Sequence, residues 1–464
     1  MSALPKPRVA LLNPPGRELY IRDYYCSKVS KTGYLYHPTD LLTASGVLDG
    51  AAEMIVIDAI AERLSVEATL EKLQTFKPDV VLMLSGAVSF HEDRDFALEL
   101  QKRLPCRVLV SGDLFMEDAE GLLAEHGWMD AILTDFTTPA LVDYVRGKEG
   151  PLAGITRRGT PPSTEKPAAG YEIPRPRHDL FPINRYRYPF VRRRPFATML
   201  TDYGCPYPCT FCIQSEVGFK LRSVDSVMAE LDWLASKGYR EIYFTDQTFA
   251  VRKDRTLELC GRMARAPWKL GWVCFSRADV VDEARLSAMK AAGCHTVMFG
   301  IESGSDAMLD HYKKKLVVAD IRDALARCRK MGLRTVGTFL IGLPEENEAQ
   351  IRTTIDLACE LPLDYASFNI PVPRKMTGLR KEAIALGLVD AATTRMDQSG
   401  KSMVVMGTRH LTAAQVQALR KEALKRFYLR PGYLLRRLAM LRTPYEVGVN
   451  VTEGWSLVKD ALGR

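Results

Sequence analysis

Two long parts of the chain alternate short apolar runs with stretches of helical periodicity, and this alternation limits the possible folds most strongly. Parallel strands need crossover connections, which are usually helices, so the order predicts parallel sheets wound with helices. Between residues 8 and 147 it predicts a five-strand, Rossmann-like domain. The predicted strands are Arg8 to Leu12, Glu53 to Asp58, Asp79 to Leu84, Arg107 to Ser111 and Ala131 to Thr134, with helices over 38–48, 66–76, 94–104 and 118–126.

A second series of six runs predicts a partial (β/α)6 TIM-like barrel, which would carry its chemistry at the carboxyl ends of the strands. Helices are expected near 224–236, 254–265, 283–291, 318–331 and 347–360. The predicted strands are Phe196 to Thr201, Glu241 to Thr245, Gly271 to Phe275, Thr296 to Gly300, Arg334 to Ile341 and Tyr365 to Ile370.

Four segments follow from these patterns in an α/β chain. Nine prolines fall between residues 151 and 195, which indicates a linker draped over the surface. From residue 376 the pattern is helical and basic. We therefore expect a Rossmann-like domain over 1–150, a Pro-rich linker over 151–195, the barrel over 196–375 and a helical C-terminal region over 376–464.

The composition is that of a globular protein. The 464 residues include 64 Lys+Arg and 56 Asp+Glu, and the resulting charge of +8 is too mild to indicate a partner. The ten cysteines are too scattered for a disulfide-stapled scaffold, and no secretory or membrane-spanning segment is apparent. We expect a cytoplasmic protein in which the seven cysteines outside one cluster are buried free thiols.

The exceptional cysteines are Cys205, Cys209 and Cys212, spaced C-x3-C-x2-C after the first barrel strand. Three thiolates on one loop can bind three irons of a 4Fe-4S cluster and leave the fourth iron open for catalysis. Gly204 would fix the loop in a non-helical path, and Phe211 would shield the cluster. The alternatives are a zinc loop or core cysteines at chance spacing. Zinc would need a fourth ligand, which no nearby Cys or His supplies at zinc-knuckle spacing.

With this loop, the chain resembles the radical S-adenosylmethionine (SAM) superfamily. The resemblance covers about residues 196–375 and implies that SAM chelates the open iron. An electron then cleaves the C5′–S bond, and the 5′-deoxyadenosyl radical removes a substrate hydrogen. It also implies a flavodoxin or ferredoxin as electron donor. Four further segments match in order: FTDQTF (244–249), FSRAD (275–279), FGIESGS (299–305) and FLIGLP (339–344).

The resemblance also implies roles for single residues. Glu302 would bind the SAM amine or ribose, and Arg277 its carboxylate, although a salt bridge from Arg277 to Asp279 is the alternative. Asp246 either faces the substrate or caps the following loop, and Asn369 is expected at the substrate. The other expected SAM contacts are the secondary donors Ser276 and Ser303, and Gly342 and Pro344 beside the adenine.

Placed before such a barrel, the first domain resembles the cobalamin-binding domain of the B12-dependent radical SAM class, whose main members are methyltransferases. Asn13-Pro14-Pro15 matches the opening of that class. The D-x-H-x-x-G motif of ordinary B12 enzymes is absent, which is common in this class and therefore neutral. Bulkier residues replace glycines over 111–113 and 134–138, which weakens the case for a buried nucleotide tail. The expected cobalamin contacts are Asn13, Ser85, Ser89, Ser111 and Gly112.

Two further segments have alternative interpretations. The loop over residues 20–40, rich in Tyr, Arg and Lys, would either approach the cobalt, with His37 or Cys26 nearby, or project toward the barrel mouth and cover the substrate. Residues 420–442 hold eight basic residues and one acidic residue. This stretch would either cap the barrel with a solvated basic face or contact a membrane surface or lipid; no nucleic-acid-binding module accompanies it. The second helix of this stretch has an apolar face of Leu434, Leu435, Leu438 and Leu441.

The sequence thus predicts a radical SAM enzyme that removes hydrogen from an unactivated carbon of a small molecule, with a lipid or a sugar among the candidates. One version is a cobalamin-dependent C-methyltransferase. The alternative is a cobalamin-free oxidoreductase, dehydratase or cyclase whose first domain only covers the site. An interpretation of another class is a metal-stabilised, non-catalytic scaffold.

Overall fold

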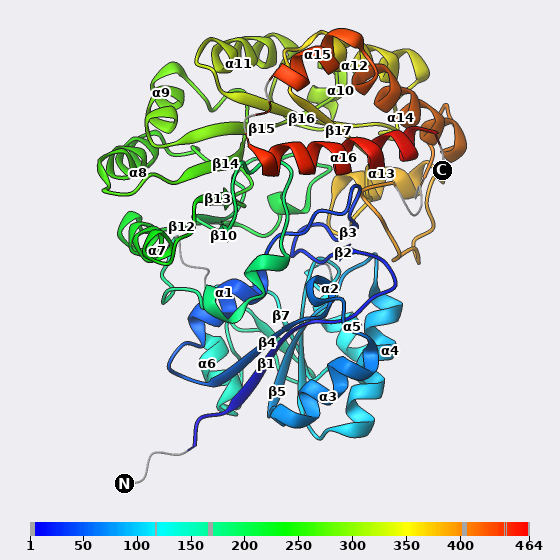
Figure 1. Cartoon of the computed structure of the whole chain (residues 1–464). Helices are drawn as coiled ribbons and strands as arrows, with labels where there is room; N and C mark the ends of the chain where they lie inside the picture. Colours follow the sequence, from blue (N-terminus) through cyan, green and yellow to red (C-terminus); the bar gives the residue numbers. More distant parts are fainter. Residues whose placement is uncertain are drawn as a thin grey trace. The chain divides into compact units, whose positions relative to one another are not determined.

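The computed structural model describes residues 5–116, 118–165, 170–400, 406–439, 441 and 443–462. They form two compact units, drawn in Figure 1 and treated separately below. The first unit contains the chain up to Ser30, Leu35–Arg187 and Lys220–Ser226. The second contains Lys31–Tyr34, Tyr188–Phe219 and the chain from Val227 onward.

The first unit is built on a sheet with the strand order β4-β1-β5-β6-β7-β8. Its first five strands are parallel, and in chain order they run 2-1-3-4-5, the flavodoxin-like doubly wound arrangement. Helices cover both faces, as Figure 1 shows, so β5 is buried along its whole length. All five predicted strands are confirmed, as β1 (Arg8–Asn13), β4 (Glu53–Asp58), β5 (Val80–Leu84), β6 (Arg107–Ser111) and β7 (Ala131–Leu133). The helices are α1 (Thr39–Val47), α2 (Ala59–Glu62), α3 (Val66–Phe76), α4 (Phe90–Arg103), α5 (Ala119–Glu125) and α6 (Ala140–Val145).

The Pro-rich segment adds a strand that the sequence did not indicate. β8 (Ile155–Arg157) pairs antiparallel with β7 at the sheet edge, where neighbouring prolines are tolerated. The remainder of the segment up to Arg187 also packs within the first unit. Its short elements are β9 (Gly170–Tyr171), η1 (His178–Leu180) and η2 (Ile183–Arg185), and the loop after β1 forms the small hairpin of β2 (Tyr20–Ile21) and β3 (Lys28–Val29).

The second unit contains six parallel strands in the order β10-β13-β14-β15-β16-β17, which confirms every predicted barrel strand. β15 extends two residues beyond the prediction at each end. The strands are β10 (Phe196–Met199), β13 (Glu241–Phe244), β14 (Gly271–Ser276), β15 (Cys294–Glu302), β16 (Arg334–Leu340) and β17 (Tyr365–Asn369). The connecting helices are α7 (Val224–Ser236), α8 (Lys253–Arg265), α9 (Glu283–Ala291), α10 (Asp306–His311), α11 (Val318–Lys330) and α12 (Glu348–Glu360).

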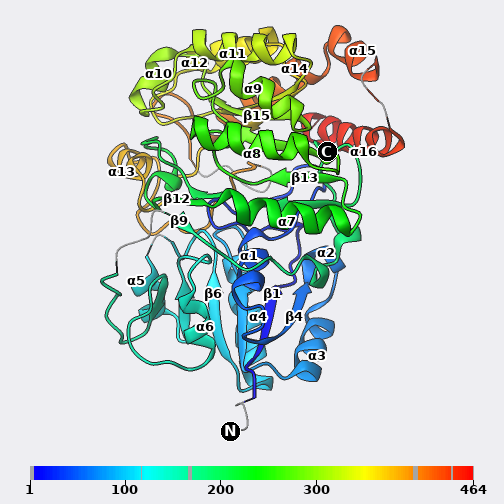
Figure 2. The ribbon, with the colours of Figure 1, turned by 90° about the vertical axis from the view of Figure 1, so that its left-hand side faces the viewer.

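The C-terminal region of the second unit is helical, as predicted. α14 packs against α12, α16 and β17, so it closes the side of the sheet that ends in β17. Figure 2 shows α12, α14 and α16 in the second unit. The predicted break at Pro431-Gly432 is confirmed, because α14 ends at Tyr428 and α15 begins at Pro431. Arg442, the last residue of the predicted basic stretch, lies outside the described residues. The helices are α13 (Gly378–Ala385), α14 (Ala413–Tyr428), α15 (Pro431–Ala439) and α16 (Pro444–Leu462).

Two sequence expectations about the whole chain can be compared with these residues. Within the described ranges, no helix is both long and apolar enough to cross a bilayer. All ten cysteines are free thiols. Of the seven outside the cluster loop, five are buried, whereas Cys106 and Cys359 are only partly buried.

Candidate radical site

The cysteine loop leaves the second unit's first strand through the short strand β11 (Asp202–Gly204) and ends at η3 (Ile213–Ser215). Burial, together with the neighbouring thiols Cys209 and Cys205, raises the pKa of Cys212 to about 12. Burial also raises the pKa of Cys209, which Lys314 and Arg277 oppose. The three cysteines therefore share one electrostatic environment with two cations beside it, which suits a group held by thiolates.

The three sulfurs do not form a single-ion site. Over the described part of the chain, no group of three or more His, Cys, Asp or Glu side chains could hold a metal ion. In a 4Fe-4S cluster each thiolate binds a different iron, so the sulfurs need not converge on one point. Assembly of the predicted cluster on these three cysteines stays a prediction, and a structural zinc site would need four converging ligands.

Gly204 fixes the beginning of the loop. Its φ is +78°, and a Cβ added there would lie 1.7 Å from the carbonyl oxygen of Gly218. No amino acid other than glycine can adopt this backbone conformation with another backbone atom so close. The predicted role of Gly204 in setting the path of the loop therefore has a direct structural basis.

Asp246, at the end of β13, anchors the chain that leads into the cysteine loop. Its Oδ1 accepts hydrogen bonds from the backbone nitrogens of Thr201 (2.6 Å) and Asp202 (3.2 Å), and its Oδ2 accepts one from Thr201 Oγ1 (2.6 Å). The side chain is fully buried. The predicted cap of the following loop is not what the structure shows, because both carboxylate oxygens accept hydrogen bonds from residues that precede the cysteine loop. A contact of Asp246 with the substrate stays a prediction.

Glu302 ends β15 in a strained conformation. Its φ of +67° lies in the left-handed region, and the register between β15 and β16 shifts between Gly300 and Glu302. Such strain in a non-glycine residue is typical of functional sites. Glu302 Oε1 lies 2.9 Å from Lys314 Nζ, and both side chains are largely buried. Burial lowers the pKa of Lys314, but the attraction of Glu302 outweighs it and raises the pKa above its usual value.

Arg277, which follows β14, links the loop to this ion pair. Its Nη1 lies 3.8 Å from the sulfur of Cys209, its Nη2 donates to the carbonyl oxygen of Lys314 at 2.7 Å, and its guanidinium carbon lies 3.8 Å from the ring centroid of Tyr207. The predicted alternative salt bridge is present, because Nε and Nη2 contact both oxygens of Asp279 at 3.0 and 2.9 Å. Binding of the SAM carboxylate by Arg277 stays a prediction.

The other predicted SAM residues lie at the expected ends of strands, but internal contacts engage them. Ser276 Oγ donates to Phe249 O at 2.8 Å, and Ser303 Oγ accepts a hydrogen bond from Ser305 N at 3.2 Å. Phe211 packs beside the apolar cluster around Tyr312. The SAM contacts of Ser276 and Ser303, and the shielding of the cluster by Phe211, also stay predictions.

The turn Gly342-Leu343-Pro344 after β16 needs its glycine for a reason other than the predicted one. Gly342 has φ +94°, and a Cβ there would lie 2.5 Å from Val416 Cγ1 of α14. The space beside Gly342 is therefore filled by α14. The packing of this helix explains why a glycine stands here, whereas the adenine of SAM was the expected reason. The carbonyl of Pro344 accepts a hydrogen bond from Arg409 N at 2.8 Å.

Glu346 makes this turn sensitive to pH. Its Oε2 accepts hydrogen bonds from the backbone nitrogens of Gly342 and Leu343, both at 2.9 Å, and burial raises its pKa to about 7. In that range the folded state holds the proton more tightly than the unfolded state, so stability falls as pH rises. Between about pH 4 and pH 8, the free energy of unfolding of the wild type should fall by about 3 kcal/mol relative to Glu346→Gln, as measured by urea unfolding. A constant difference between the two proteins would contradict this prediction.

The tip of the loop over residues 20–40 belongs to the second unit. Lys31 Nζ donates to Asn369 Oδ1 (2.8 Å), Phe368 O (2.9 Å) and Ser367 Oγ (3.1 Å) at the carboxyl end of β17. The tip therefore lies where the predicted substrate residue Asn369 is, which corresponds to the barrel-mouth alternative. Lys31 was not predicted, because its position depends on a contact across more than 330 residues of sequence.

His37, in the same loop, is a structural residue of the first unit. Its ring is fully buried, with its centroid 4.1 Å from that of Tyr186, and burial lowers its pKa well below the usual value. Cys26 is also buried.

In the first unit, the carboxyl ends of β1 and β5 meet at the topological switch point, where such sheets bind ligands. The buried guanidinium of Arg22 fills this point. Its Nη1 donates to Asn13 Oδ1 (2.9 Å), its Nη2 pairs with Asp93 (2.6 Å), and its Nε donates to Ser89 Oγ (3.1 Å). The predicted cobalamin contacts Asn13 and Ser89 are therefore engaged by Arg22, a residue that sequence reasoning missed.

One carboxyl group nearby is incompletely bonded. Asp40, at the start of α1, accepts a hydrogen bond from Ser111 Oγ at 3.1 Å through Oδ2, whereas its buried Oδ1 has no hydrogen-bond partner among the described residues. Burial raises the pKa of Asp40 well above its usual value, which favours the protonated carboxyl group, the form that could donate to a polar ligand such as an amide. At the adjacent strand ends, Gly112 is required because a Cβ would lie 1.8 Å from the carbonyl oxygen of Ser85.

The geometry can be compared with known proteins. A family model of the radical SAM superfamily matches residues 199–358. The uncharacterized methyltransferase PH0819 of Pyrococcus horikoshii is 31% identical over 415 residues, which cover 86% of this chain and 89% of that protein. The anaerobic magnesium-protoporphyrin IX monomethyl ester cyclase of Cereibacter sphaeroides is 24% identical over 383 residues, 77% of this chain and 59% of the cyclase.

Solved structures of similar fold cover nearly all of the chain, among them that of TsrM. The radical SAM methyltransferase TsrM from Kitasatospora setae, with cobalamin and a 4Fe-4S cluster bound, has a TM-score of 0.69 at 17% identity, over 99% of this chain and 100% of that one. This similarity shows that the fold is shared along the whole chain.

Proposed function

The chain belongs to the radical SAM superfamily, and from this premise we propose that it is a cobalamin-dependent methyltransferase that acts on an unactivated carbon of a small molecule. The position of the cysteine loop carries the radical part of the proposal, because Arg277 and the strained pair of Glu302 and Lys314 lie beside it. The methyl-transfer part is supported by the methyltransferase name of the 31% identical relative and by the cobalamin bound in the structure of similar fold.

Each group would have a defined task. When bound, the cluster and SAM supply the hydrogen-abstracting radical, and the corrinoid supplies the methyl group. Cys205, Cys209 and Cys212 would hold the cluster, and Glu302 and Arg277 would orient SAM through its amine and carboxylate. The remaining task is recognition of the substrate. It would fall to residues at the carboxyl end of β17, the edge strand opposite β10, which leads into the cysteine loop.

Lys31 and Asn369 would recognise the substrate at the end of β17. Their hydrogen bond presents polar groups there, which favours a substrate with carboxylate, hydroxyl or amide oxygens. We also propose that a flavodoxin or ferredoxin delivers the electron and that the reaction takes place in the cytoplasm.

The cobalamin fit is partial, and this favours one alternative. Arg22 donates hydrogen bonds to Asn13 and Ser89, two of the predicted cobalamin contacts, whereas Asp40 Oδ1 could still form a hydrogen bond with a ligand. If no corrinoid binds, the same barrel residues would serve a cobalamin-free oxidoreductase, dehydratase or cyclase. One relative is named a cyclase, which is one of the reaction types of this version, although the name does not say which cofactors that cyclase uses.

Product analysis separates the two versions. The reconstituted protein is incubated anaerobically with SAM and dithionite, with and without hydroxocobalamin. Both versions predict 5′-deoxyadenosine, but only the methyltransferase predicts S-adenosylhomocysteine that depends on the added corrinoid. 5′-Deoxyadenosine as the sole product under both conditions would favour the cobalamin-free version, and no SAM-derived product would contradict both.

A further inference from the structure

The arginines of α15 face the body of the second unit. Arg436 Nη2 donates to the carbonyl oxygen of Leu363 at 2.9 Å. Arg437 Nε donates to Asn450 Oδ1 at 2.8 Å, and its guanidinium carbon lies 4.0 Å from the ring centroid of Tyr365. These contacts fix the rotation of the helix about its axis, because they use both basic side chains of the helix.

The leucines of α15 consequently face outward. Leu434, Leu435 and Leu438 are 47%, 70% and 68% exposed. This is the reverse of the solvated basic face that the sequence suggested, so that interpretation of α15 is wrong. An amphipathic helix normally buries its apolar side, and the reversal leaves apolar surface to be covered by something else.

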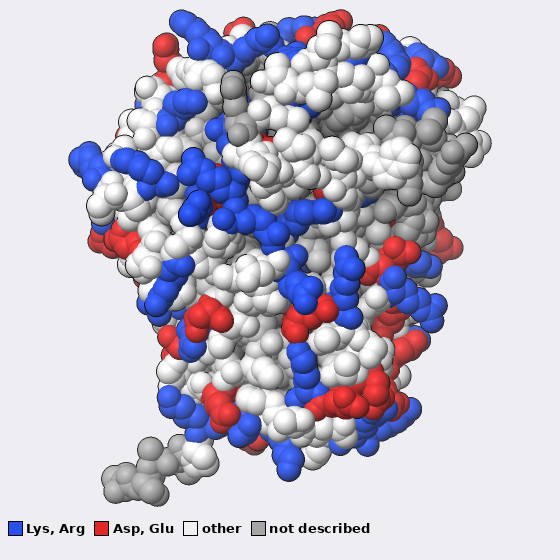
Figure 3. Space-filling model, in the orientation of Figure 1, with Lys and Arg blue, Asp and Glu red and all other residues white. Residues whose placement is uncertain are grey.

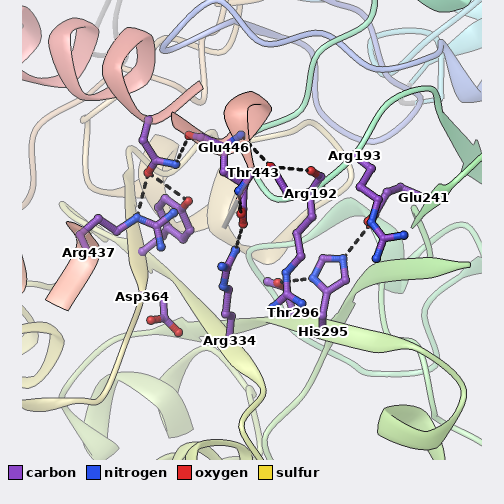
Figure 4. Close-up of polar contacts among 12 residues, drawn as sticks. Arg192, Arg193, Glu241, His295, Thr296, Arg334, Asp364, Arg437, Thr443 and Glu446 are labelled. Carbon is purple, nitrogen blue, oxygen red and sulfur yellow. Dashed lines mark hydrogen bonds and ion pairs between the residues drawn. The ribbon is translucent and has the colours of Figure 1, made fainter. Parts of the chain in front are cut away.

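α16 continues the apolar surface. Val447, Val451 and Trp455, spaced four residues apart on one face, are 45%, 68% and 63% exposed. The opposite face is anchored, because Glu446 lies 2.5 Å from Arg334 in a buried ion pair (Figure 4). The outward direction of this stripe is therefore also fixed by polar contacts on the inner side.

The charges around this surface are positive. The only carboxylates among the described side chains of α15 and α16, Glu446 and Glu453, are 3% and 6% exposed. Arg193 and Arg194 are exposed, and the guanidinium of Arg194 lies 6.0 Å from the ring centroid of Tyr445 at the start of α16. Figure 3 shows a largely uncharged area over α16, bordered by a band of Lys and Arg side chains.

We propose that the apolar surface of α15 and α16, defined by Leu434, Leu435, Leu438, Val447, Val451 and Trp455, rests on the surface of an anionic lipid bilayer. Leucine and tryptophan side chains flanked by arginines are typical of helices that lie in a membrane interface, and the described side chains of α15 and α16 include no exposed carboxylate. The exposed side chains of Arg193 and Arg194 would attract the lipid phosphates, and the apolar side chains would enter the acyl boundary. The proposal does not depend on the reaction that the barrel catalyses.

Vesicle flotation tests the proposal with the full-length, cluster-loaded protein. The probes are vesicles of phosphatidylcholine alone and of phosphatidylcholine mixed with phosphatidylglycerol. The test variant is L435E/L438E, and the matched control is V66E/L98E, which replaces residues that are 46% and 43% exposed in the first unit. Thermal unfolding and SAM cleavage check that each variant is folded.

The wild type and the control should float with the anionic vesicles, more weakly at high salt. The variant should bind on the order of tenfold more weakly, because a charge replaces each inserted leucine. Three results would overturn the proposal: no flotation of the wild type, equal loss of flotation in both variants, or a lipid-free dimer that L435E/L438E dissociates. The last result would show that a second copy of the chain covers this surface.

Discussion

Replacement of Cys205, Cys209 and Cys212 by alanine together is expected to remove the brown colour, about four irons per chain and all formation of 5′-deoxyadenosine after anaerobic reconstitution. The loop supplies every thiolate that the cluster would use. Iron analysis, visible absorption and product chromatography give independent measurements of the loss.

The matched control for the cysteine variant is C106A/C359A. Like Cys205 and Cys212, these two thiols are only partly buried, but they lie outside the loop. The control should keep the iron content and the SAM cleavage of the wild type. A cluster retained in the triple variant would contradict the assignment of the loop.

Gly204→Ala should prevent cluster assembly without touching a ligand. At φ +78° the alanine costs about 1–2 kcal/mol, and its Cβ would collide with the carbonyl oxygen of Gly218, so the start of the loop has to move. We expect loss of nearly all iron and a fall of several kcal/mol in the free energy of unfolding.

The chain contains a close control for this effect. Gly218 has φ +82°, but a Cβ added there meets nothing within 4 Å. Gly218→Ala should therefore cost only about 1–2 kcal/mol and keep the cluster. Equal iron content and equal urea midpoints in the two variants would show that the close contact at Gly204 has no effect on the loop.

The positions of the strands and of the cysteine loop could be predicted because they depend on local pattern. Buried parallel strands are continuous apolar runs, and the ligand spacing of the loop is written in consecutive residues. β8 was missed because three residues at a sheet edge carry too short a signal among prolines.

The surroundings of the candidate site could not be predicted in the same way. The ion pair of Glu302 with Lys314 depends on a strained turn, which is a property of the backbone and not of residue type. Arg22 and Lys31 reach their partners across long stretches of sequence. For α15, helical periodicity identified the apolar side of the helix. Whether that side faces inward or outward depends on hydrogen-bond acceptors in a distant segment, such as Leu363 O, which accepts from Arg436.

Corrinoid binding tests the central claim, cobalamin-dependent methyl transfer, most directly. The full-length protein is purified anaerobically in the presence of hydroxocobalamin, separated from free cofactor by gel filtration and examined by absorption spectroscopy. The account predicts stoichiometric corrinoid that co-elutes with the protein beside the cluster. A cluster-containing protein that cleaves SAM but elutes without corrinoid would contradict it.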